Sequence, residues 1–172
     1  MGKGELEPDI MIVFECENQY ARDLERVIEL RRLVKAQFKL ERIYHTFMIR
    51  CTPKACSSRH SAFCYTDSKL LDRDHYCILT EQPCMGLPVP PDTNQIINCL
   101  SYLIEEIDIL RPRYVLLLGE RVCEYVLKCY GIFTSPSPGQ SFSVNHMQLL
   151  TAVSEQLFSN EDCCKLLASL SA

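Results

Sequence analysis

The chain has 172 residues, of which 47% are hydrophobic and 23% charged, and a formal net charge of −4. This length suits one domain whose core buries roughly two thirds of the unfolded surface, so we expect a single domain over residues 1–172. The acidic balance excludes a general attraction to nucleic acid. The first nine residues lack the apolar core of a secretory signal, and no apolar run approaches a membrane span of roughly 20 residues, so we expect an intracellular protein.

The first half of the chain predicts a strand, a helix and a second strand. Ile10–Phe14 is a continuous apolar run, typical of a strand buried on both faces. Apolar residues recur near helical spacing over Gln19–Lys39 with charged residues between them, which predicts an amphipathic helix. Tyr44–Arg50 predicts the second strand.

The second half predicts further helices and strands in alternation. Asp92 and Gln95 form a capping-box pattern that starts a helix, which Pro112 ends. Tyr114–Leu118 is a strong strand pattern, and Gly119 turns it directly into a helix, as in a β-α unit of a parallel sheet. The elements expected after Gly119 are a helix over Glu120–Cys129, a loop over 132–146, a strand over Met147–Val153 and a helix over Phe158–Leu170.

This order of elements predicts the α/β class, as a three-layer α/β/α sandwich around a central sheet of about four parallel strands. A Cys-rich insertion occupies about residues 51–91 and shows no sustained periodicity. A segment of that length without secondary structure of its own is uncommon in a compact domain unless something cross-links it.

Six of the eleven cysteines gather between residues 51 and 99, and they supply the candidate cross-link. They are Cys51, Cys56, Cys64, Cys77, Cys84 and Cys99. Clustered thiolates are ligands for zinc or an iron-sulfur cluster, whereas an intracellular chain has little use for disulfides. We expect four of the six to hold a metal centre, with His60 and His75 as alternative ligands for zinc. The remaining five, Cys16, Cys123, Cys129, Cys163 and Cys164, are expected to be small buried residues.

One stretch of the chain is basic despite the acidic total. Between Arg42 and Thr66 there is no acidic residue, and the stretch contains Arg42, Arg50, Lys54 and Arg59. These four side chains are candidates for contacts with DNA phosphates. Solvated surface charge is the alternative interpretation.

The segment Cys99–Gly119 (CLSYLIEEIDILRPRYVLLLG) resembles a segment of the iron-sulfur uracil-DNA glycosylases, family 4 of the uracil-DNA glycosylase superfamily. In that family a cysteine, an amphipathic helix, a proline and a strand ending in Leu-Gly follow one another at the same intervals. Phe47–Pro53 (FMIRCTP) resembles the end of the family's second strand, and Ile10–Asn18 (IMIVFECEN) resembles its first strand running into the catalytic loop. The resemblance implies the same α/β fold, DNA as a partner and a [4Fe-4S] cluster.

In the family, an N-terminal Cys-x-x-Cys pair, a cysteine after the second strand and a cysteine opening the next helix hold the cluster. Cys51 and Cys99 match the last two, although Cys84 also lies at the family's distance from Cys99 and is an alternative to Cys51. The N-terminal pair is missing, and we expect two cysteines of the insertion to replace it. The resemblance favours [4Fe-4S] over zinc, which is the alternative cofactor.

The residues that would carry uracil excision in the family are mostly different here. Glu17 falls at the position of the family's loop glutamate and is the catalytic candidate, but the glycines around it and the following glycine-rich segment with its aromatic residue are missing. Phe47 takes the place of an asparagine, and it can stack on a base but cannot make the hydrogen bonds that select uracil. Ala152-Val153-Ser154 stands in place of His-Pro-Ser, and we expect His146 at the other end of the same strand.

The sequence therefore predicts a metal-containing, uracil-DNA glycosylase-like protein without catalysis, which binds DNA or a replication or repair protein as an accessory module. The first alternative is an active but divergent glycosylase that removes uracil with Glu17. The second is a structural subunit of a larger assembly, which the acidic second half of the chain suits equally well.

Overall fold

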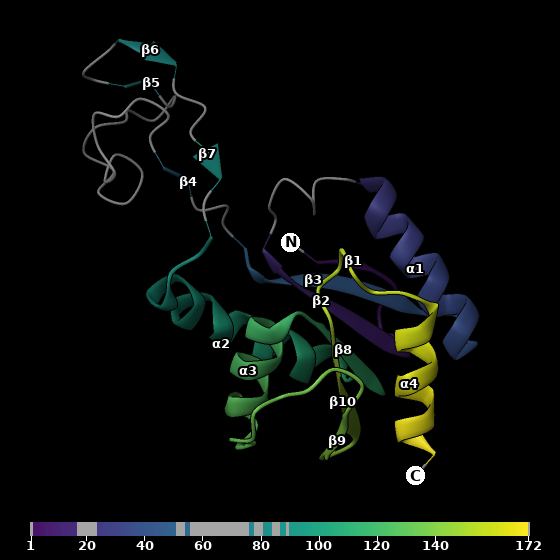
Figure 1. The fold of residues 1–172 in the computed structure, drawn as a ribbon. Coiled ribbons are helices and arrows are strands. Elements are labelled where there is room, and N and C mark those ends of the chain that lie inside the picture. The colour runs from purple at the N-terminus through teal and green to yellow at the C-terminus, as the bar shows by residue number, and fades with distance from the viewer. Residues whose placement is uncertain are drawn as a thin grey trace.

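The computed structural model describes residues 2–16, 24–50, 54–55, 76–77, 81–83, 87–88 and 90–171. A six-stranded sheet lies at its centre, in the order β1-β3-β2-β8-β10-β9 (Figure 1). The strands are β1 (Lys3–Gly4), β2 (Ile10–Cys16), β3 (Ile43–Ile49), β8 (Tyr114–Leu118), β9 (Ser141–Val144) and β10 (Met147–Ala152).

The four inner strands are parallel, as the sequence predicts. In their register, Val13 of β2 lies opposite Thr46 of β3 on one side and Leu117 of β8 on the other. β8 pairs in parallel with β10, from Tyr114 opposite Gln148 to Leu118 opposite Ala152. The two outer strands, β1 and β9, are antiparallel to their neighbours, so the sheet is mixed.

The expectation of a loop over 132–146 is wrong for β9. Its residues, Ser-Phe-Ser-Val, pair with β10 across a turn at Asn145 and His146. Asn145 has φ 51°, a left-handed conformation that asparagine tolerates and that tight hairpins require. The strand has only a few residues and is partly exposed. Its alternating pattern was therefore too short to be recognised among the surrounding Ser, Pro and Gly residues.

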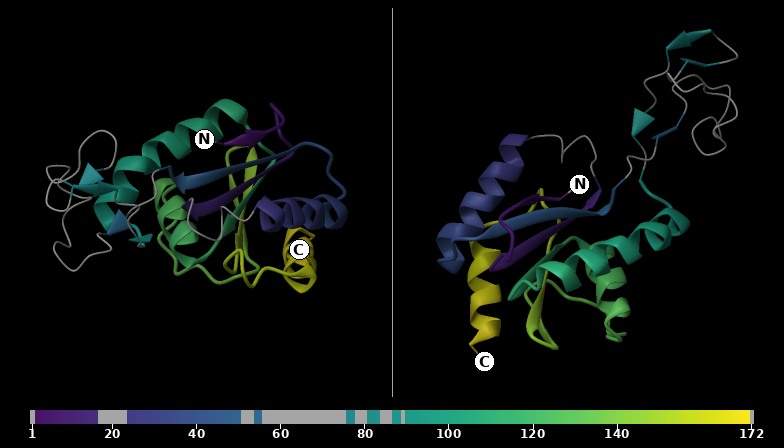
Figure 2. Two further views of the ribbon diagram at one scale, coloured as in Figure 1. Left: turned by 90° about the horizontal axis from the view of Figure 1, so that it is seen from above. Right: turned by 180° about the vertical axis from the view of Figure 1, so that it is seen from behind.

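Helices cover both faces of the sheet (Figure 2). Helices α1 (Leu24–Phe38) and α4 (Asn160–Leu170) pack over one face, and α2 (Thr93–Leu110) and α3 (Glu120–Cys129) over the other. Alternate residues of β2 enter the two cores. In β2, Met11 and Val13 face α2 and α3, whereas Ile12 and Phe14 face α1 and α4. The three-layer sandwich is confirmed.

The ends of α2 and the start of α3 follow the predicted signals. The N–H of Gln95 donates to Asp92 Oδ1 at 2.8 Å, and the N–H of Asp92 donates to Gln95 Oε1 at 2.9 Å, which completes the capping box. Gly119 has φ 97°, a conformation that side chains disfavour, and it allows β8 to turn directly into α3. The predicted start of the first helix at Gln19 lies outside the described residues.

Two short ladders lie within residues 51–91. β4 (Lys54–Ala55) pairs with β7 (Leu87–Pro88), and β5 (Tyr76–Cys77) pairs with β6 (Gln82–Pro83), both antiparallel. The expectation that this segment has no secondary structure of its own is therefore wrong at these residues, where two-residue strands are too short to produce a pattern in the sequence. Within the described part of the chain, no helix is long and apolar enough to cross a membrane.

Candidate functional site

The four parallel strands end together at one edge of the sheet, which we call the carboxyl edge. In open α/β sheets this edge is where ligands bind, because loops and helix N-termini converge there. The backbone N–H of Gly119, just after β8, donates to the carbonyl of Ala152 at the end of β10 at 3.2 Å. This hydrogen bond holds the start of α3 beside the segment that follows β10.

A pocket of about 430 Å³ opens at this place. Its lining combines the start of α3, the end of β10 and a proline-containing loop, in the residues Glu120, Cys123, Pro136, Ser137, Pro138, Ala152, Val153, Ser154 and Leu157. Thr151 fixes the loop on β10, because its hydroxyl donates to the carbonyl of Ser137 at 2.6 Å and accepts from the N–H of Gln140 at 3.2 Å. The pocket is therefore held from three sides by the fold itself.

The polar groups in the pocket are two serines, one carboxylate and one thiol. Burial raises the pKa of Cys123 to about 11, and its Sγ donates to the carbonyl of Leu117 at 3.4 Å. The thiol is thus neutral near pH 7 and unsuited to act as a nucleophile. None of the described lining residues is a histidine. His146 lies in the turn before β10, at the opposite end of that strand, as the sequence predicts.

A charged pair beside the pocket was not predicted from the sequence. Glu15, near the end of β2, places Oε1 2.7 Å from Arg121 Nη1 of α3, in an ion pair without the alignment of a hydrogen bond. Arg121 also donates from Nη2 to the carbonyl of Pro91 at 2.6 Å. Burial raises the pKa of Glu15, although Arg121 opposes the shift. The available signal was one acidic residue directly after the apolar run Ile10–Phe14.

Arg42 and Arg50, the two candidate DNA contacts whose side chains the structure describes, lie at opposite ends of β3. Eight residues of extended chain separate them by about 26 Å, so they do not form one phosphate site. Arg42 forms an ion pair with Asp9 at 2.9 Å, and its hydrogen bond to that carboxylate lowers the pKa of Asp9. Arg50 forms an ion pair with Glu106 at 3.2 Å and donates to the carbonyl of Tyr102 at 3.3 Å.

The structure describes the other candidate site residues to different extents. Glu17 and Arg59 lie outside the described residues, and Lys54 is described only through its backbone in β4. Phe47 is 7% exposed and packs in the core against Phe14, with ring centroids 5.6 Å apart, and against His45. A base could stack on Phe47 only if the ring left this core. Its role in stacking, like that of Glu17 in catalysis, stays a prediction.

Of the six clustered cysteines, only Cys99 has a described side chain. It is half-buried on α2 and packs against the core beneath that helix. Cys77 is described through its backbone in β5, and Cys51, Cys56, Cys64 and Cys84 lie outside the described residues. The described side chains contain no group of three or more His, Cys, Asp or Glu residues placed to hold a metal. One cysteine side chain is too few for a zinc or [4Fe-4S] site, so the metal centre also stays a prediction.

The five cysteines outside that cluster divide into two groups. Cys16, Cys123 and Cys163 are buried, as predicted, whereas Cys129 and Cys164 are exposed. The prediction is wrong for these two. Cys164 lies on the outer face of α4, next to the buried Cys163, and Cys129 is the last residue of α3, where the helix ends.

Comparison with known proteins agrees with this architecture. The family model described as the uracil DNA glycosylase superfamily matches residues 20–157. No curated protein matches the chain. The matched range includes α1, the strands β3, β8 and β10, and every residue that lines the pocket at the carboxyl edge. It spans more than half of the chain, and the chain belongs to the uracil-DNA glycosylase superfamily.

Proposed function

We propose that this uracil-DNA glycosylase-like protein has lost uracil excision and acts as an accessory module that binds DNA in replication or repair. The observation that carries the proposal is the chemistry of the pocket at the carboxyl edge. Ala152, Val153 and Ser154 line it where the family has His-Pro-Ser, and Glu120 lines it as well.

The chemical argument concerns the charge that develops on the leaving base. When the glycosidic bond breaks, negative charge accumulates on the uracil, and positioned donors must stabilise it. A carboxylate from Glu120 opposes that charge, and the neutral Cys123 thiol already donates to a backbone carbonyl. The burial of Phe47 at the position of the family's asparagine further supports the loss of uracil selection.

A direct assay tests the loss of excision. The protein is incubated with uracil-containing single- and double-stranded oligonucleotides, and abasic products are sought after alkaline cleavage. We expect no product above that of a heat-inactivated control. In parallel, fluorescence anisotropy should detect binding of the same DNA that weakens steeply with salt. Absence of DNA binding at low salt would contradict the accessory role.

An active, divergent glycosylase is the second candidate, and the pocket itself favours it, since about 430 Å³ of space at the carboxyl edge can admit a base. If abasic products form, the variant Glu17→Ala should abolish them, and the variant Glu5→Ala, which changes an exposed acidic residue beside the start of β3, should not. Product formation that Glu17→Ala abolishes would replace the first proposal by this one.

The proposal includes a metal centre, a [4Fe-4S] cluster or alternatively zinc, held by four of the cysteines between Cys51 and Cys99. The pairing of β4 with β7 supports it, because this ladder brings the two ends of the Cys-rich segment together. Metal and sulfide analysis of anaerobically purified protein distinguishes the cluster from zinc. The variant Cys99→Ser should lower the metal content, and the exposed Cys164→Ser should leave it unchanged. Metal-free wild-type protein would refute the metal centre.

A further inference from the structure

Helix α2 carries two apolar stripes, of which the sheet covers only one. Ile96, Leu100, Leu103 and Ile107 form the buried stripe. Three further isoleucines, Ile97, Ile104 and Ile109, lie outside this stripe, and together we call them the outer stripe. Ile97 and Ile104 share one side of the helix, and Ile109 lies about 120° around the axis from Ile97. Ile97 is 57% exposed and Ile109 is 71% exposed, so the outer stripe presents large aliphatic side chains to solvent.

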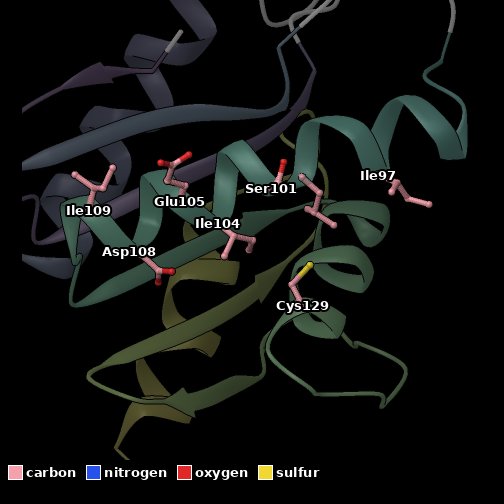
Figure 3. Close-up of a pocket in the computed structure, with 8 residues that line it drawn as sticks. Ile97, Ser101, Ile104, Glu105, Asp108, Ile109 and Cys129 are labelled. Atoms are coloured by element: carbon pink, nitrogen blue, oxygen red, sulfur yellow. The ribbon is translucent and has the colours of Figure 1, made fainter.

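The outer stripe lines a groove of about 660 Å³ between α2 and the end of α3 (Figure 3). Ile97 and Ile109 lie toward the two ends of the groove, and Cys129 of α3 lies on its far side. Twelve residues of helix separate the two isoleucines, a length of about 18 Å. A second helix of about three turns spans this length.

The carboxylates of Glu105 and Asp108 border the same groove (Figure 3). Neither forms an ion pair with any residue in the part of the chain that the structure describes. Both lie in the last two turns of α2, near the negative end of the helix dipole, and the last turn contains no basic residue. Two carboxylates without an ion-pair partner among the described residues therefore adjoin the apolar groove.

We propose that this groove binds an amphipathic helix of a partner protein, with aliphatic residues on the face that contacts α2 and Lys or Arg at its border. The aliphatic face would cover Ile97 and Ile109, and the cations would neutralise Glu105 and Asp108. DNA does not suit the site, because its phosphates would meet these carboxylates. A second copy of α2 does not suit it either, because symmetric packing would oppose acidic borders. The proposal goes beyond the one above and holds whether or not uracil excision is lost.

A designed peptide tests the chemistry of the groove. The probe is a fluorescein-labelled, helix-forming peptide of about 15 residues with leucines on one face and lysines beside them. Its control carries glutamate in place of each lysine. We expect saturable, salt-sensitive binding of the lysine peptide alone, with NMR shift changes that map to α2 and α3. Equal binding of both peptides, or shift changes that map elsewhere, would overturn the proposal.

Variants then assign the binding to the groove. The double variant Ile97→Glu, Ile109→Glu should weaken binding of the lysine peptide by at least about tenfold, as expected when charges replace two large apolar contacts. The matched variant Phe133→Glu changes a side chain that is 78% exposed outside the groove and should have no effect. The double variant Glu105→Lys, Asp108→Lys should reverse the preference toward the glutamate peptide. The substituted side chains are all exposed, so we expect the three variants to fold, and urea unfolding checks this.

Native mass spectrometry tests whether a second copy of the chain occupies the groove instead. We expect the wild-type protein alone to be monomeric at concentrations where the peptide binds. A dimer that Ile97→Glu, Ile109→Glu dissociates would assign the groove to a second copy and overturn the proposal. Since none of these readouts uses excision or DNA binding, their failure is distinct from a failure of the proposed function.

Discussion

Arg50 and Glu106 join the end of β3 to α2 through an ion pair of 3.2 Å, and the Glu106 side chain is only 14% exposed. The same carboxylate accepts hydrogen bonds from the hydroxyl of Tyr44 at 2.8 Å and from that of Thr46 at 2.7 Å. Burial, followed by the hydrogen bond to Glu106, raises the pKa of Tyr44 to about 12. Glu106 therefore organises three side chains along one strand.

The variant Glu106→Ala should lower the free energy of unfolding by about 2–4 kcal/mol, because two hydroxyls and one guanidinium lose a charged acceptor. Urea denaturation measures the change. The neighbouring variant Glu105→Ala changes an exposed side chain on the same helix and should stay within about 0.5 kcal/mol of the wild type. Similar changes in both variants would show that the contacts of Glu106 add no measurable stability.

Glu15 should make the stability of the protein depend on pH. Because burial raises the pKa of Glu15 in the folded protein above its unfolded value, the folded state holds this proton more tightly. Its contribution to stability is present in acid and is lost as the pH rises through the folded pKa. The variant Glu15→Gln should therefore gain stability relative to the wild type as the pH rises from 4 to 7. Urea unfolding at several pH values checks the trend.

Arg121 opposes that shift, so the variant Arg121→Ala should raise the pKa of Glu15 further. NMR titration of the Glu15 carboxyl carbon measures the change directly. An unchanged pKa would mean that the ion pair of 2.7 Å does not persist in solution.

His45 should destabilise the fold in acid. Burial, followed by the charge of Arg31, lowers the pKa of His45 to about 4 from 6.5. Arg31 Nη1 lies 2.9 Å from His45 Nδ1, and since a guanidinium only donates, this nitrogen accepts and the ring is neutral. The unfolded chain takes up the proton first, so stability is complete above pH 6.5 and falls by up to about 3 kcal/mol as the pH drops toward 4.

The variant His45→Gln keeps an acceptor for Arg31 but cannot titrate, so it should flatten the stability profile between pH 4 and 6.5. Urea unfolding across this interval measures the slope. Phe133→Ala, which changes an exposed residue, should keep the slope of the wild type. Equal slopes in all three proteins would assign the acid sensitivity to other groups.

Two adjacent cysteines of α4 should react at very different rates. Cys163 is fully buried, and burial raises its pKa to about 12, whereas Cys164 is exposed. Alkylation with iodoacetamide followed by peptide mass spectrometry should show Cys163 reacting at least about tenfold more slowly than Cys164. In urea, where the protein is unfolded, both cysteines should react at similar rates, which provides the reference. Similar rates for the two in native buffer would indicate that α4 opens readily.

The inner sheet could be predicted from the sequence because its strands are buried on both faces and read as continuous apolar runs. Ile10–Phe14 and Tyr114–Leu118 are such runs, and they became the adjacent strands β2 and β8. The outer strands could not be predicted in this way. β1 has two residues, Lys3 and Gly4, and β9 alternates serine with apolar residues in a polar surrounding, so neither gives a clear period.

The charge pairs of the candidate site could not be predicted because their partners are distant in sequence. The stretch from Arg42 to Thr66 has no acidic residue of its own, yet Asp9 and Glu106 reach it from other elements. Glu15 and Arg121 likewise meet only after β2 and α3 pack together. The position of Ala152-Val153-Ser154 at the end of the last inner strand could be predicted, since a strand end is a local feature, but the pocket that these residues line could not.

The outer strands also bear on how the protein behaves at high concentration. The open side of an edge strand has free amide and carbonyl groups that can pair with a strand of another molecule. Long, flat, apolar edge strands promote such pairing and the growth of fibrils. Here the two edge strands of the sheet are β1, which has two residues including a lysine, and β9, which has four residues including two serines. Neither segment is long or hydrophobic enough to favour the addition of a strand from another molecule. The edges of the sheet therefore disfavour aggregation through strand pairing.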